Sequence, residues 1–234
     1  MLPKTAPPNE WPPAFEPSIP SRASRRLPKR SSVSAVGRLV NPKTRHRIGF
    51  QSMIEMHTAL VLMARPDLLD LIDQPSPITY RGQDGVEHRH TFDFLATFDD
   101  GQRIAIECKA EWRAKRDDLE GFYRSLATQI PRTFADRIKV VTEASFSQAQ
   151  IYDATLLYDC QRDPSNRFDT AVRTVASGLF GSVSVATLIA TINGGDDGAT
   201  FRAIVRAIGA GILVKLSTGP FDYATSVGRY EVVK

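Results

Sequence analysis

The sequence predicts an α/β fold, a mixed sheet flanked by helices, followed by a small C-terminal winged-helix-like domain. Three observations support this prediction. An apolar, helix-forming stretch precedes three strand-like runs whose side chains alternate between apolar and polar. A helix, a strand and another helix follow, an order typical of a layered α/β domain. After a polar break at residues 162–166 come three helix-like segments and two short strands, which is the order of a winged helix.

The N-terminal residues 1–34 form a basic, proline-rich arm that we expect to be disordered or extended. They contain Pro, Ser and Arg without an apolar period and cannot bury enough surface to offset chain entropy. The next residues, up to 49, are mixed and predict irregular structure. We therefore expect the α/β domain to span residues 35–162 and the winged-helix-like domain to span residues 163–234.

The first helix is predicted from Phe50 to Met63, ending before Pro66. Its apolar residues lie on more than one face at 100° per residue. Glu55 falls on a face whose neighbours one and two turns later are apolar too. The carboxylate is therefore expected to be partly buried, which is costly unless a cation meets it.

Alternating runs predict three antiparallel strands, with turns at 83–85 and 99–101. In the second run, Phe92 and Phe94 should share one face while Asp93 points to the other. In the third run, Glu107 and Lys109 are two residues apart and should share a face. The expected strands are residues 77–81, 90–98 and 103–109. The later elements are expected as helices at 117–130 and 147–160, a strand at 138–142, C-terminal helices at 168–179, 183–192 and 199–210, and strands at 212–217 and 229–233.

Glu55, Asp93, Glu107 and Lys109 form the strongest candidate site. The turn at 99–101 should bring the strand of Asp93 beside that of Glu107, so that both carboxylates can share a hard cation such as Mg²⁺, which prefers oxygen ligands. A charged lysine is no metal ligand, but it can orient the attacking water and balance phosphate charge. Surface ion pairs are the alternative explanation of this pattern.

The motifs also resemble a known family. They are similar to the catalytic domain of TnsA-type transposon endonucleases, members of the PD-(D/E)xK nuclease superfamily, over roughly residues 35–160. Phe92 stands where that family usually has proline before the metal-binding aspartate. The motifs that carry the resemblance are FQSMIE at 50–55, DQP at 73–75, TFDF at 91–94, DG at 100–101 and IECK at 106–109.

The resemblance implies a restriction-endonuclease-like fold and Mg²⁺-dependent hydrolysis of a DNA phosphodiester at a transposon 5′ end, with Mn²⁺ as a possible substitute. By the resemblance, Glu55, Asp93 and Glu107 are the metal ligands and Lys109 the catalytic lysine. It further implies double-stranded DNA as substrate, a transposase partner that cuts the other strand, and an ATPase regulator bound through the C-terminal region. The function classes implied are hydrolase, DNA transposition and DNA recombination.

Charge distribution also favours a polyanionic partner. Residues 1–50 carry a net charge of +8, residues 51–160 carry −6 and residues 161–234 carry +2. Basic arms displace counterions from phosphates, although a solubilising tail would look the same. Further candidate DNA contacts are Arg113, Lys115 and Arg116, which follow Lys109, and Arg202 and Arg206 on the expected third C-terminal helix, which would read DNA.

Other residues admit simpler interpretations. His88 and His90 could bind a transition metal, but an exposed hairpin is the favoured interpretation. Gln74 and Pro75 predict a turn, and Gln129 could support the site from the following helix. Cys108 and Cys160 fit a reducing compartment better than a disulfide or zinc site. Without an apolar leader or span we expect a cytoplasmic protein and no membrane partner.

Two other functions remain open from the sequence. One is a DNA-binding or assembly adaptor without catalysis. The other is a stand-alone nuclease of phage processing or defence.

Overall fold

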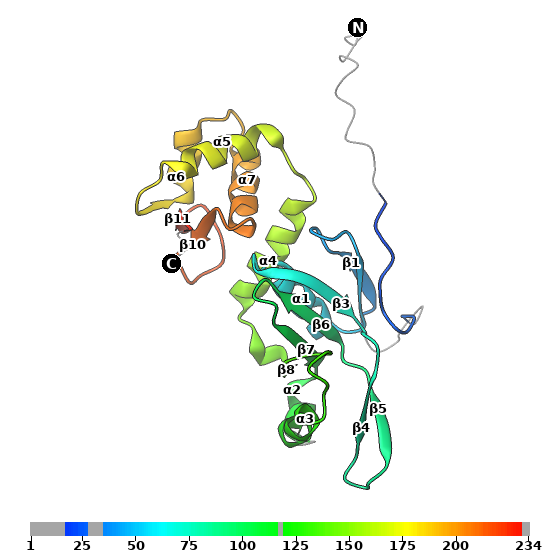
Figure 1. The fold of residues 1–234 in the computed structure, drawn as a ribbon. Coiled ribbons are helices and arrows are strands. Elements are labelled where there is room, and N and C mark those ends of the chain that lie inside the picture. Colours follow the sequence, from blue (N-terminus) through cyan, green and yellow to red (C-terminus); the bar gives the residue numbers. More distant parts are fainter. Residues whose placement is uncertain (1–16, 28–34, 117–118, 231–234) are drawn as a thin grey trace.

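The computed structural model describes residues 17–27, 35–116 and 119–230. The chain forms a first lobe around a four-stranded sheet and a second lobe of helices with a small sheet (Figure 1). Helix α4, Gln148–Gln161, joins them: Ala154 packs in the core of the first lobe, and Leu157 and Cys160 pack in that of the second. None of the helices in these described ranges is long and apolar enough to cross a bilayer.

The central sheet has the strand order β3-β6-β7-β8. The first three strands are antiparallel, and β8 runs parallel to β7. The predicted mixed sheet flanked by helices is therefore confirmed. Its strands are β3 Leu68–Asp73, β6 Phe94–Phe98, β7 Arg103–Cys108 and β8 Arg137–Val141.

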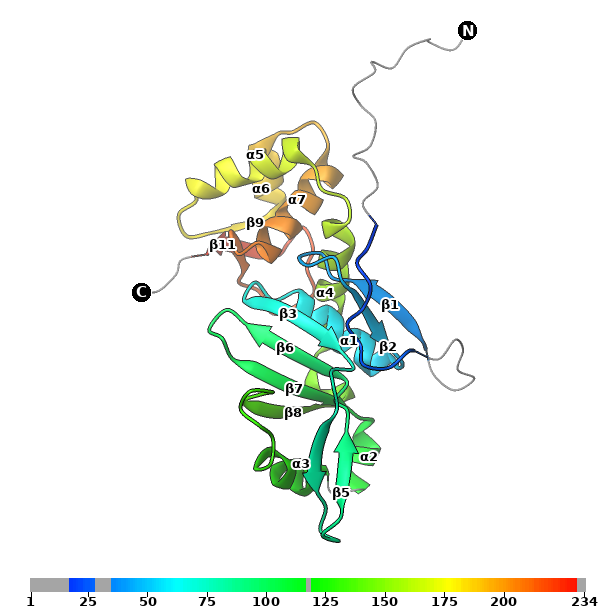
Figure 2. The same cartoon turned by 45° about the vertical axis from the view of Figure 1, so that its right-hand side comes forward.

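Helices cover both faces of this sheet (Figure 2). α1, Met53–Met63, and α4 pack on one face, where Phe94 and Ile106 are buried. α3, Leu119–Ala127, packs on the other face with Leu95 and Ala105. The period-two pattern within β6 and β7 explains this division, because consecutive side chains point to opposite faces of a strand.

The predicted strand at 90–98 is wrong, since the chain bends between two separate strands. β5, Glu87–His90, pairs with β4, Ile78–Arg81, in a hairpin that extends away from the central sheet (Figure 1). β6 starts only after the bend at Asp93. Phe92 and Phe94 therefore lie in opposite cores instead of sharing a face.

The strand that pairs with the outer side of β6 is β3, which the sequence reasoning missed. Its sequence, LLDLID, places two aspartates in a strand at the edge of the sheet, and these obscure the alternation. The predicted strand at 77–81 exists as β4 but lies in the separate hairpin.

The N-terminal expectations also need correction. Residues 17–27 pack against the first lobe, so the expectation of disorder is wrong for them; residues 1–16 and 28–34 lie outside the described residues. The stretch expected to be irregular contains the antiparallel hairpin of β1, Gly37–Val40, and β2, Arg47–Phe50. A short helix α2, Glu111–Arg116, precedes α3; residues 117 and 118 of the helix expected there are outside the described part.

The second lobe contains three helices and an antiparallel sheet of order β10-β11-β9. β9 was missed and β11 begins earlier than expected; residues 231–234 are outside the described part. The elements are α5 Asn166–Ser177, β9 Ser182–Ser184, α6 Val185–Ile192, α7 Asp197–Gly209, β10 Leu213–Lys215 and β11 Ser226–Arg229.

Helix α7 lies in the core of the second lobe. Ala203, Ile204 and Val205 are all buried on it, and the helix packs against α4, α5, α6 and β10. A helix enclosed in this way has little surface left for a DNA groove, so the structure does not support the expectation that α7 reads DNA.

Candidate active site

Asp93 lies in the bend before β6, next to the end of β7. Its backbone N–H donates to the Ile106 carbonyl at 3.0 Å. Its side-chain Oδ2 accepts a hydrogen bond from the Cys108 N–H at 2.8 Å, and Oδ1 accepts one from Nε2 of Gln74 at 3.1 Å. The carboxylate is therefore held in one orientation at this end of the sheet.

Glu107 is buried beside Asp93, with its side chain 3% exposed. Lys109 Nζ lies 2.5 Å from its Oε1, and His90 Nε2 lies 3.0 Å from its Oε2. The Tyr123 hydroxyl of α3 is hydrogen bonded to it as well. Burial alone would raise the pKa of Glu107, but the hydrogen bond from His90 and the charge of Lys109 outweigh it and lower that pKa. Glu107 is therefore ionised and held from three sides.

Glu55 enters from the first turn of α1. Ser52 caps this helix: its Oγ accepts from the Glu55 N–H at 3.1 Å and donates to Glu55 Oε1 at 3.0 Å. Glu55 Oε2 accepts from the Gln51 N–H at 2.7 Å. This reciprocal capping gives the carboxylate a structural role at the helix N-terminus. Burial raises its pKa, and these hydrogen bonds together with the charges of Lys109 and Arg25 oppose that rise.

The three carboxylates are close enough for their charges to act on one another. Burial raises the pKa of Asp93 to about 7, and the charges of Glu107 and Glu55 add to the rise. Glu107 is held as an anion by its hydrogen bonds and by Lys109, so an added negative charge on Asp93 is disfavoured. A cation at this position would relieve the repulsion.

The donor set suits a hard divalent cation, since it consists of carboxylate oxygens from different elements. However, no group of three His, Cys, Asp or Glu side chains within the described residues is arranged to hold a common ion. The contacts explain why. Glu55 is turned toward its own helix terminus, and Glu107 is paired with Lys109. Metal binding would require these two side chains to change partners.

Helix α2 follows Lys109 directly and carries three of the predicted DNA-binding residues. Its Trp112 is 58% exposed, and the guanidinium groups of Arg113 and Arg116 lie 5.2 and 5.0 Å from the ring centroid. Lys115 is mostly exposed and pairs with Glu111 at 2.7 Å. An exposed aromatic ring with two guanidinium groups therefore comes shortly after Lys109 along the chain, but whether it touches DNA stays a prediction.

The two arginines predicted on α7 are remote from this site, in the second lobe. Arg206 is 10% exposed at its side chain, pairs with Asp169 at 2.7 Å and donates to the Cys160 carbonyl at 3.2 Å. The guanidinium thus holds α7 to α5, and whether Arg206 also contacts DNA stays a prediction. Arg202 lies 3.3 Å from Asp163 and is partly exposed, so its role stays a prediction.

Sequence reasoning missed three residues that contact the carboxylates. Gln74, read as part of a turn, does end β3, yet its buried side chain holds Asp93. His90, placed on an exposed hairpin, points to Glu107 with 18% of its side chain exposed. Nothing in the sequence around Tyr123 indicated a role at the site, because an aromatic residue on a helix usually packs in the core. The proposed support from Gln129 is directed elsewhere, because its amide bonds the backbone of Arg81.

The chain matches none of the known protein-family models, and no curated protein is significantly similar to it. The resemblance to TnsA-type endonucleases is therefore carried by the motifs alone.

Proposed function

We propose that this chain is a metal-dependent DNA endonuclease that hydrolyses phosphodiester bonds. Glu55, Asp93 and Glu107 would hold Mg²⁺, or Mn²⁺ in its place. Lys109, beside them, would orient the attacking water and balance the charge of the phosphate. One observation carries the proposal: three acidic side chains from a helix, a bend and a strand gather with one lysine at the end of β7, where burial and mutual repulsion raise the pKa of Asp93 to about 7.

The protein groups have separable tasks in this proposal. A bound divalent ion would supply Lewis-acid polarisation of the phosphate and a bound water of lowered pKa. Lys109 orients the water and balances charge on the phosphate. His90 and Tyr123 hold Glu107 in place, and Gln74 does the same for Asp93.

The finer fold and the biological setting belong to the same proposal. The first lobe would be restriction-endonuclease-like, as the TnsA-type motifs imply. The second lobe would be winged-helix-like, since a strand between its first two helices joins the terminal hairpin in one sheet. The substrate would be double-stranded DNA at a transposon 5′ end, with a transposase cutting the other strand and an ATPase regulator bound to the second lobe.

The test is nicking of supercoiled plasmid by the purified full chain with Mg²⁺ or Mn²⁺, with and without EDTA. We expect nicking that Asp93→Asn and Lys109→Ala abolish. The matched controls are Asp99→Asn, in an exposed turn, and Lys139→Ala, exposed on the neighbouring strand β8; both should nick like the wild type. Absence of metal-dependent nicking by the wild type, or its persistence in both site variants, contradicts the proposal.

A second candidate is a DNA-binding adaptor without catalysis. The arrangement of Glu107, paired with Lys109, and Glu55, turned to its helix terminus, favours it, because neither is oriented toward a shared ion. It predicts salt-sensitive DNA binding that divalent ions leave unchanged and no strand cleavage. Calorimetric titration with Mn²⁺ separates the two, since only a nuclease site should bind the ion in an Asp93-dependent manner.

A further inference from the structure

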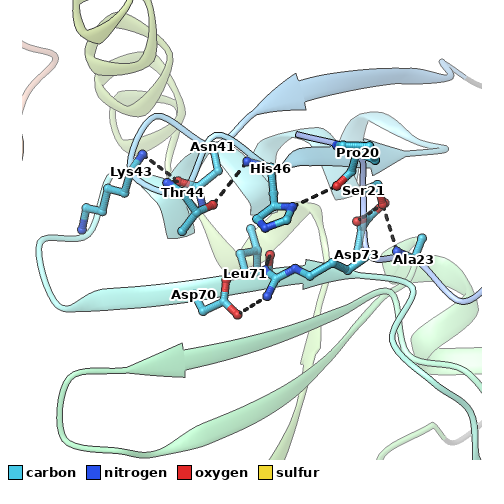
Figure 3. A network of polar contacts seen from close by, with 11 residues as sticks. Pro20, Ser21, Ala23, Asn41, Lys43, Thr44, His46, Asp70, Leu71 and Asp73 are labelled. Atoms are coloured by element: carbon cyan, nitrogen blue, oxygen red, sulfur yellow. Dashed lines mark hydrogen bonds and ion pairs between the residues drawn. The ribbon is translucent and has the colours of Figure 1, made fainter. Parts of the chain in front are cut away.

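Residues 17–27 form a segment, here called the strap, that crosses the β1–β2 hairpin and reaches β3. Ile19 bridges to the hairpin: its N–H donates to the Arg45 carbonyl at 2.9 Å, and its carbonyl accepts from the Arg47 N–H at 2.9 Å. The Pro20 carbonyl lies 2.9 Å from Nδ1 of His46 (Figure 3). The strap is thus bound to the fold by backbone as well as side-chain contacts.

Two aspartates of β3 fasten the strap to the sheet edge. Arg22 forms a two-pronged contact with Asp70, with N–O distances of 2.9 and 2.5 Å. The Ser21 hydroxyl donates to Asp73 at 2.7 Å, and Asp73 is 1% exposed (Figure 3). A buried carboxylate needs such partners. Asp70 and Asp73, which obscured β3 in the sequence, therefore both bind the strap, and Asp73 also accepts the Gly49 N–H of β2 at 2.8 Å.

The strap continues from there to the candidate active site. The Ser24 N–H donates to the Gln74 carbonyl at 2.8 Å. Arg25 then donates from Nε to the Gln74 side-chain oxygen, and Nε2 of the same amide donates to Asp93 at 3.1 Å. Gln74 adopts a left-handed backbone, φ 43°, which non-glycine residues rarely do. Its unusual conformation allows one amide to contact both the strap and the metal-site carboxylate.

Arg25 also lies near enough to one carboxylate to act on it by its charge. Its charge acts on Glu55, as does that of Lys109. The residue is exposed, so a ligand in solvent can reach it. A phosphodiester approaching three carboxylates would be repelled unless cations flank them. Lys109 supplies one such cation from β7, and Arg25 supplies another from the strap.

We propose that the strap is part of the active site and that Arg25, held by Gln74, binds a backbone phosphate of DNA beside Glu55 and Asp93. This inference rests on the proposed DNA-cleaving function. A guanidinium has five donors, so donation of Nε to Gln74 leaves its other edge able to form the paired hydrogen bonds that a phosphate accepts. Gln74 thereby couples phosphate binding to the orientation of Asp93.

The experiment measures the affinity of the full chain for a short DNA duplex in EDTA over a range of salt concentrations. Arg25→Ala should weaken binding about tenfold, since a charge-assisted hydrogen bond is lost. It should also reduce the slope of log K against log salt by about 0.9, the value of one phosphate contact. Arg26→Ala is the matched control, an exposed arginine of the same strap, and should change neither.

Arg25→Lys separates charge from positioning. It keeps the cation, so the salt slope should stay near that of the wild type, but it loses the planar group that contacts Gln74. Its nicking rate at saturating DNA should therefore fall, as should that of Gln74→Ala. Melting curves of all variants establish that each is folded.

Because binding is measured without metal, the outcomes distinguish this inference from the function on which it rests. If the wild type nicks DNA while Arg25→Ala keeps wild-type affinity and slope, the role of Arg25 is overturned and the nuclease stands. If Arg25→Ala loses affinity and slope but the wild type never nicks, the phosphate contact stands and the nuclease is overturned. Failure of the wild type to bind DNA overturns both.

Discussion

Replacing Asp93 by asparagine should destabilise the metal-free protein slightly at acidic pH and stabilise it at alkaline pH. The pKa of Asp93 is raised to about 7 in the folded chain, first by burial and then by Glu107 and Glu55, against 3.8 for the ordinary carboxyl group. A raised folded-state pKa means that the fold favours the protonated form. The stability that this proton gives is fully present below pH 3.8 and is lost as the pH rises through about 7.

The magnitude follows from the shift. Between pH 5 and pH 8 the unfolded carboxyl is already ionised while the folded one loses its proton, which lowers the free energy of unfolding by about 2 to 3 kcal/mol. Asparagine does not titrate, so Asp93→Asn escapes this loss. It has one acceptor oxygen for the donors Cys108 N–H and Gln74 Nε2, so it loses about 1 kcal/mol at either pH.

The assay is urea unfolding of both proteins in EDTA at pH 5 and pH 8. The free energy of unfolding of Asp93→Asn relative to the wild type should rise by about 2 to 3 kcal/mol between these pH values. Asp99→Asn, in an exposed turn, should show no such change. A relative stability of Asp93→Asn that is the same at pH 5 and pH 8 refutes the reasoning.

The remaining predictions concern three side chains. Lys109→Ala should abolish nicking and also destabilise the fold, because it leaves the buried carboxylate of Glu107 without its cation. Plasmid nicking and urea unfolding measure the two effects. A loss of stability at unchanged nicking would contradict the role assigned to Lys109. His90→Ala should lower kcat roughly tenfold or more with little change in KM, because His90 holds the proposed metal ligand Glu107 and does not contact the substrate. An effect on KM alone in steady-state kinetics would argue against this role. Arg206→Ala should cost at most about 3 kcal/mol in urea unfolding, because Asp169 loses its cation while it retains the Ser165 N–H, and it should leave DNA affinity unchanged. Loss of affinity in the folded variant would show that Arg206 contacts DNA.

Much of the candidate site followed from local periodicity. The spacing of Glu107 and Lys109 placed both on one face of a strand, and the structure brings them within 2.5 Å. The apolar surroundings of Glu55 on its helix predicted a buried carboxylate, and it is 9% exposed. Periodicity succeeds here because it is a property of the backbone of each element by itself.

What only the tertiary structure decided is which elements meet. β3, with its two aspartates, looked unlike a strand because its polar partners come from the strap, about 50 residues earlier in the chain. Gln74 and Arg25 likewise gain their proposed roles from the packing of the strap against the end of β3. The sequence of α7 suggested an exposed DNA-recognition helix. In the structure α4 and α5 pack around it, and Arg206 is hydrogen bonded to Asp169 of α5 and to the Cys160 carbonyl of α4. The sequence does not show whether a charged residue will be solvated by water, bind a phosphate or pair with a distant carboxylate. That depends on which segments pack together and on the desolvation that the packing imposes.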